Sequence, residues 1–91
     1  MFAVVVRESG ETERIEASAD IVESRVAPMV RRAPGFVSAV WMSDRAGGTL
    51  NVITFESEAA ATAALEAARS SPRPPFMKLE RVDLFRVLAR A

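Results

Sequence analysis

Cysteine, histidine and tyrosine are all absent from this chain of 91 residues. Without cysteine there is no disulfide, no thiolate metal site and no cysteine nucleophile. Without histidine the commonest general base and the usual zinc or haem ligand are missing, and without tyrosine there is no phenolic acid. Chemistry must therefore come from carboxylates, arginines, hydroxyls, Lys78, Asn51 and Trp41, and we expect neither a metal ion nor a cofactor.

The chain also lacks an excess of charge and a long apolar run. Twelve basic and twelve acidic residues cancel, so no patch for nucleic acid or an anionic membrane is expected. No stretch approaches the roughly 20 apolar residues of a membrane span, and no basic segment precedes the apolar N-terminal run. We expect a cytoplasmic protein.

The length predicts a single domain over residues 1–91 with a small core. A chain of this size buries only about 60% of its unfolded surface or slightly more. Hydrophobic residues make up 49% of the sequence, which leaves apolar surface in need of a second layer. Self-association is the simplest way to cover that surface.

Four segments have the composition of β-strands: residues 2–8, 36–43, 49–56 and 77–88. The second and third are joined by a glycine-containing loop at residues 44–48 and predict a hairpin. The first strand is an unbroken apolar run. In the last strand both alternating sets are apolar, with Leu79, Phe85 and Val87 on one face and Val82, Leu84 and Leu88 on the other.

Two segments have helical patterns, and residues 11–17 are interpreted as a connection. The first helix covers residues 20–33, with a candidate capping box at Asp20 and Glu23, Ser18 as the alternative cap, and Pro28 loosening the turn before it. The second helix, at residues 58–69, begins after the N-cap Ser57 and is rich in alanine. Its small side chains either leave room for a ligand or reflect helix propensity, and we favour the second reading.

The order β-α-β-β-α-β predicts an α+β, ferredoxin-like fold, a four-stranded antiparallel sheet with two helices on one face. Such a sheet needs a polar free face, yet the first and last strands do not alternate strictly. We therefore expect a homodimer with the sheets face to face. The RNA-recognition fold has the same element order, but residues 50–56 lack its basic-glycine-aromatic signature.

Two passages carry a resemblance to a known family: residues 34–38 (Pro-Gly-Phe-Val-Ser) followed by Trp41, and residues 52–59 (Val-Ile-Thr-Phe-Glu-Ser-Glu-Ala). In these passages, and in element order over nearly its whole length, the chain resembles the antibiotic biosynthesis monooxygenase-like family of dimeric α+β barrel proteins. The resemblance implies a ligand cleft between sheet and helices. It also implies cofactor-independent oxygenases and haem-degrading enzymes as relatives. The oxygenases line their cleft with Asn, Trp and often Tyr or His.

Four residues are candidates for a site. Asn51 lies in mid-strand and is the candidate catalytic residue, polarising a carbonyl or holding reduced dioxygen; the alternative is a hydrogen bond to a cross-strand backbone or hydroxyl group. Trp41 either stacks on a planar substrate or fills the core or dimer seam. Phe55 shares a face with Asn51. Met29, like Met42 and Met77, lines an adaptable pocket or fills core gaps, and for methionine the core is favoured.

Two functions follow for the chain. One is a small homodimeric protein that encloses an apolar or aromatic molecule and oxidises it as a cofactor-independent monooxygenase. The other is a non-catalytic ligand-binding or accessory protein on the same fold. Because histidine and tyrosine are missing, this second function is about as well supported as the first.

Overall fold

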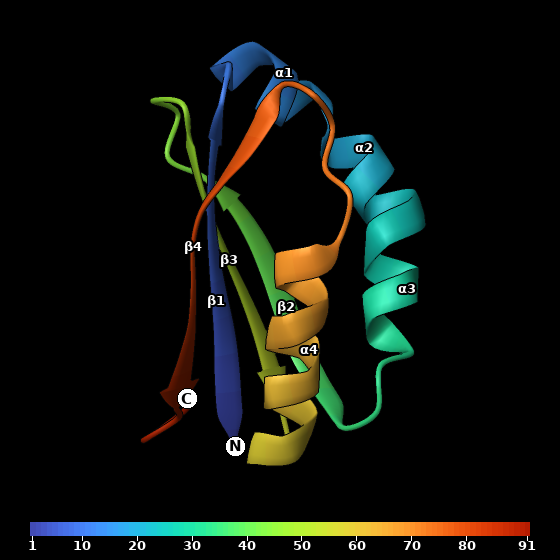
Figure 1. The fold of residues 1–91 in the computed structure, drawn as a ribbon, viewed down its shortest axis with the longest axis vertical. Coiled ribbons are helices and arrows are strands. Elements are labelled where there is room, and N and C mark those ends of the chain that lie inside the picture. Colours follow the sequence, from blue (N-terminus) through green and yellow to red (C-terminus); the bar gives the residue numbers. More distant parts are fainter.

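The computed structural model describes residues 1–91 and shows one antiparallel sheet with helices on one side (Figure 1). Along the chain the elements are β1 (Phe2–Gly10), α1 (Thr12–Ala17), α2 (Ala19–Ile21), the π-helical segment η1 (Val22–Val26), α3 (Ala27–Arg31), β2 (Phe36–Ser43), β3 (Gly48–Phe55), α4 (Glu58–Ser70) and β4 (Met77–Arg86). The strand order is β2-β3-β1-β4. The expected ferredoxin-like α+β fold is confirmed.

The core lies between the sheet and α4. Its two largest fully buried side chains are Val4 of β1 and Phe55 of β3. The ring of Phe55 meets that of Phe36 edge to face, with centroids 6.5 Å apart. The row of β1 that faces the helices continues through Val6 to Glu8, since alternate residues share a face. A carboxylate therefore stands at the end of an apolar row.

Helix α4 is held to the sheet by its small side chains. Ser57 caps it by accepting a hydrogen bond from the backbone N–H of Ala60 over 3.1 Å, as expected. Ala61 is fully buried and Leu65 nearly so, and the helix packs on β1, β3 and β4. Because the first buried residue of this face is an alanine, the helix approaches the sheet closely at its start.

The first helical layer differs from the expected helix at residues 20–33. Residues 12–17, interpreted as a connection, form α1, because a single buried side chain, Ile15, anchors a turn of good helix formers. Neither Ser18 nor Asp20 makes a capping side-chain bond, since the helical path has already begun. The loosening expected before Pro28 is confirmed by η1, because proline has no N–H to donate to the preceding turn.

A β-bulge in β4 changes which residues share a face. Arg7 of β1 lies opposite Arg81, whereas the next residue, Glu8, lies opposite Leu79. The extra residue puts Leu79 on the helix-facing side with Val82, so the prediction that Leu79 shares a face with Phe85 is wrong. Strict alternation fails wherever a strand carries such an insertion. The strand also ends at Arg86, before the expected residue 88.

The β2–β3 turn is fixed by Asp44. Its carboxylate Oδ1 accepts the backbone N–H of Gly48 at 2.9 Å and of Ala46 at 2.7 Å, and these bonds lower the pKa of Asp44. Gly47 supplies the expected positive φ, 89°. A fixed turn fixes the register of the hairpin, which places Trp41 directly opposite Asn51.

The other face of the sheet carries no helix (Figure 1). It is apolar in its centre and partly polar at its edges. Its large apolar residues are Val5, Val40, Met42, Leu50, Val52 and Phe85. Phe85 is 54% exposed and Val40 46%. None of the helices has the length and apolar character that crossing a bilayer requires.

Candidate functional site

Two adjoining cavities lie between the sheet and the helical layer. The large cavity has a volume of about 680 Å³ and the small cavity about 570 Å³. Their walls share six residues: Glu8, Ser18, Val22, Trp41, Asn51 and Met77. The space is large enough for a drug-sized molecule of several fused rings.

The large cavity is walled by every layer of the fold. Apolar residues dominate the wall, and a polar group stands at one end of it. The sheet contributes Val4, Val6, Trp41, Asn51, Ile53 and Phe55, the first helical layer Val22, Val26, Met29 and Val30, and α4 Ala64, Ala67 and Ala68. The segment after α4 adds Ser71, Pro72, Arg73, Pro74 and Phe76.

The cavity exists because two helical faces meet without filling the space between them. No apolar residue of η1 or α3 is fully buried, although their spacing is that of a core-facing helix. On the other side α4 presents alanines, which are too short to reach across. The reading that the alanine run reflects helix propensity alone is therefore incomplete, because Ala64, Ala67 and Ala68 border the cavity.

Glu8 and Asn51 meet at the polar end of the cavity. The Nδ2 of Asn51 donates to Oε1 of Glu8 across 3.1 Å. Asn51 is 8% exposed, and the Glu8 side chain is 15% exposed. The cross-strand partner foreseen for Asn51 thus exists, but it is a carboxylate on β1 and not a backbone or hydroxyl group.

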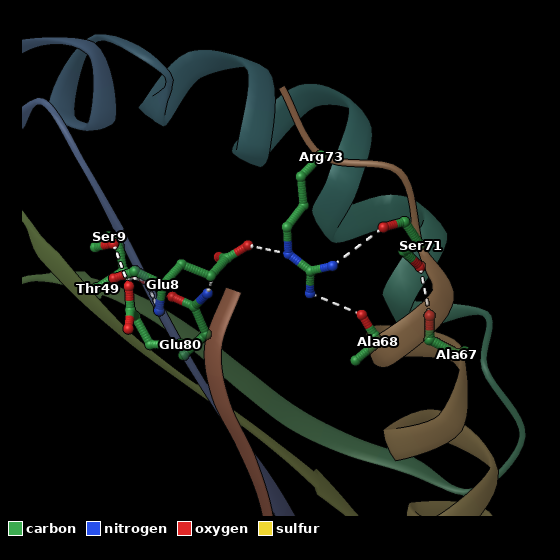
Figure 2. A network of polar contacts seen from close by, with 9 residues as sticks. Glu8, Ser9, Thr49, Ala67, Ala68, Ser71, Arg73 and Glu80 are labelled. Atoms are coloured by element: carbon green, nitrogen blue, oxygen red, sulfur yellow. Dashed lines mark hydrogen bonds and ion pairs between the residues drawn. The ribbon is translucent and has the colours of Figure 1, made fainter. Parts of the chain in front are cut away.

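Arg73 completes this polar group from the segment after α4. Its Nε donates to the other carboxylate oxygen of Glu8, Oε2, at 2.7 Å. One terminal nitrogen donates to the carbonyl of Ala68 at 2.7 Å and the other to that of Ser71 at 3.1 Å. Figure 2 shows the guanidinium between Glu8 on one side and the end of α4 on the other. The cation satisfies carbonyls at the negative end of the helix dipole.

The local sequence accounts for the position of Arg73. Prolines at 72 and 74 flank it and favour extended backbone in the residues before them. Ser71 is extended, with φ −66° and ψ 137°, and ends the helix. A cation–π contact of 5.7 Å between Arg14 of α1 and the ring of Phe76 ties the same segment to the first helical layer.

All four residues singled out from the sequence border the cavities. Trp41 and Asn51 border both, and Phe55 and Met29 border the large one. Phe55 is 1% exposed and also belongs to the core. The expectation that methionines fill the core is wrong for Met29, which is 65% exposed at the rim, and for Met42, which is 40% exposed.

Sequence reasoning missed Glu8 and Arg73. Glu8 carried a readable signal, because it continues the alternate row of Phe2, Val4 and Val6, where a solvated charge is not expected. Arg73 carried none, since an arginine among prolines in a connection is ordinary. Only the folded chain brings these residues, 65 positions apart, together.

The site offers hydrogen-bond and charge chemistry. No group of three or more acidic side chains is arranged to hold a metal ion. The carboxylate of Glu8 can accept a proton, and the amide of Asn51 and the guanidinium of Arg73 can donate hydrogen bonds to a negative oxygen. The apolar wall around these groups strengthens such interactions because it lowers the local dielectric constant.

Solved structures share this fold. They include a cofactor-independent oxygenase, SnoaB from Streptomyces nogalater (22% identity, TM-score 0.64, covering 98% of this chain and 94% of that chain). Another is a monooxygenase from the ActVA-Orf6 gene of Streptomyces coelicolor in complex with nanaomycin D (21%, TM-score 0.63, 99% and 89%). A third is the heme-degrader MhuD from Mycobacterium tuberculosis with two hemes in its active site (16%, TM-score 0.62, 100% and 99%).

These similarities confirm the expected likeness of fold and extend no further, since the identities are low. No protein-family model matches the chain, and no curated protein matches it.

Placing a larger side chain on α4 tests whether the space beside this wall of the cavity is empty. We expect Ala68→Leu to raise the free energy of unfolding by about 1 kcal/mol, because the longer side chain buries apolar surface in space that is now empty. Urea denaturation measures this. Ala63→Leu, on the exposed side of the same helix, is the matched control and should change little. Destabilisation by Ala68→Leu would show that the wall is already close-packed.

Proposed function

We propose that the chain is a cofactor-independent monooxygenase that encloses a small, largely apolar aromatic molecule. The observation that carries this proposal is the large cavity, which is apolar over most of its wall and has its charged groups where Asn51, Glu8 and Arg73 meet. The oxygenases named above, which have the same fold, support it. Trp41 packs against the substrate, Asn51 is the catalytic residue, and Phe55 and Met29 border the remainder of the bound molecule.

The chemistry requires a substrate with a C–H group that its neighbouring carbonyl makes acidic enough to ionise. Loss of a proton leaves a delocalised carbanion, which passes one electron to dioxygen. The radical and superoxide then combine into a peroxide anion, which takes the proton back and becomes a hydroperoxide. Loss of water leaves a new carbonyl, so that R₂CH₂ and O₂ become R₂C=O and H₂O. Asn51 donates a hydrogen bond to the oxygen that gains negative charge when the carbanion forms.

A second candidate is a carrier that binds the same class of molecule without turnover. The absence of histidine and tyrosine favours it, because few groups remain to transfer protons. Both candidates use one cavity, so binding does not separate them. Turnover does.

Oxygen consumption tests the enzymatic candidate. With an anthrone as substrate, we expect the wild-type protein to consume oxygen, and Asn51→Leu to lower kcat about 10²-fold because the oxyanion loses a donor. Trp41→Ala should chiefly raise KM through lost packing. An oxygen electrode follows the rate, and circular dichroism verifies folding. Thr62→Ala, at an exposed position of α4, is the control that should keep the wild-type rate.

The two candidates predict different results in this assay. Equal oxygen consumption by wild type and Asn51→Leu would remove the proposed role of the amide. If the wild type consumes no oxygen but anthrone raises its Tm, the carrier is the correct candidate and the enzyme is not.

We further propose that the protein works as a homodimer whose subunits pack through the uncovered face of the sheet. Only nine of the 91 residues are buried within one chain, and the uncovered face exposes Val40, Met42 and Phe85. Apolar residues so grouped on a small protein indicate an interface. A second copy of the chain would cover this face through a two-fold contact in which both subunits use the same surface.

Sedimentation equilibrium tests the dimer. We expect a particle of twice 9.9 kDa for the wild type and of 9.9 kDa for the double variant Val40→Glu, Phe85→Glu, because two charges would be buried without partners. Ile21→Glu, an equally apolar exposed position on the helical layer, should remain dimeric. A monomeric wild-type protein at high concentration would contradict the proposal.

A further inference from the structure

Glu8 is the carboxylate best placed to act on a molecule in the large cavity. It borders both cavities, whereas Glu16 and Glu23 border only the small one and are exposed. Its two oxygens each accept one hydrogen bond, from Asn51 and from Arg73. A carboxylate has about four acceptor positions, so Glu8 can take a further proton donor without losing either partner.

Arg73 is the complementary donor beside it. Three of its five N–H groups are used, one each on Glu8, Ala68 and Ser71. The guanidinium is held on three sides and borders the large cavity. Its position is therefore set before any ligand enters, and its remaining donors serve a negatively charged oxygen at no cost in reorganisation.

From this pairing we infer that Glu8 and Arg73 form a recognition site for an acidic hydroxyl group, phenolic or enolic, on the aromatic ligand. Glu8 accepts the hydroxyl proton, and the electron pair of the broken O–H bond stays on the ligand oxygen. Arg73 and Asn51 donate to that oxygen. The inference rests on the proposed function for its kinetic consequence, in which Glu8 is the general base that removes the proton of the carbon acid, but its binding consequence stands alone.

Removing the charge of Glu8 and removing the charge of Arg73 should have opposite effects on the ionisation of the bound ligand. Loss of the Glu8 charge leaves the Arg73 cation without its partner, which favours an ionised ligand. Loss of the Arg73 charge leaves the Glu8 carboxylate, which disfavours an ionised ligand. If the two side chains supported only the fold, their substitutions would not shift the ionisation of the ligand in opposite directions.

The test uses alizarin, a hydroxyanthraquinone dye whose visible spectrum reports whether its hydroxyl is ionised. At one fixed pH and saturating protein, we expect Glu8→Gln to raise the ratio of ionised to neutral bound dye about tenfold and Arg73→Gln to lower it about tenfold. Glu58→Gln, an equal change of charge at the far end of α4, should leave the ratio unchanged. In the oxygen assay Glu8→Gln should lower kcat about 10²-fold.

Each result of this experiment decides a separate point. Unchanged ratios, or ratios that move in the same direction in both variants, overturn the inference. If Arg73→Gln does not fold, Glu8→Gln decides alone, and Arg73→Lys, which keeps the charge, should retain the wild-type ratio. If the wild type binds anthracene but not alizarin, hydroxyl recognition fails while the aromatic cavity stands. If it binds neither, both proposals fail.

Discussion

The ion pair between Glu8 and Arg73 is the contact on which the arrangement of the cavity depends. It joins the end of an apolar row on β1 to the proline-containing segment that leaves α4. Both side chains are largely shielded, 15% and 17% exposed, so the pair is screened less than a surface ion pair. Desolvation is offset by further bonds from Arg73 to the end of α4 and from Asn51 to Glu8. The segment is thereby fixed as a wall and does not collapse into the space beside it.

Small side chains maintain that space. Where α4 begins, Ala61 permits close packing on the sheet; further along, Ala64 and Ala68 leave the gap that the first helical layer does not fill. The π-helical turn before Pro28 belongs to the same wall and reflects a missing backbone donor. Empty apolar volume lowers the stability of so short a chain. A ligand in the cavity and a second copy on the sheet would each restore buried area.

Much of this fold follows from local patterns. The glycine-containing hairpin, the capped alanine-rich helix and the four apolar runs each carry their own signal, so their order and fold class are predictable. Helix α1 could not be predicted, because one buried residue, Ile15, makes no helical periodicity. The bulge that moves Leu79 to the other face could not be predicted either, because an inserted residue does not change the composition of the strand. Trp41, Asn51, Phe55 and Met29 stand out in the sequence as unusual or apolar residues, and the structure places them at the cavities, whereas Arg73 comes to the cavity with a contact across 65 positions.

The coupling free energy between Glu8 and Arg73 tests the account most directly. It is obtained by urea denaturation of the wild type, Glu8→Gln, Arg73→Gln and the double variant, measured at equal protein concentration because dimerisation would contribute. We predict that the single changes are not additive and that the pair contributes about 1 to 3 kcal/mol, as expected for shielded, charge-assisted hydrogen bonds. Additive single changes, with coupling near zero, would show that the pair holds nothing in place.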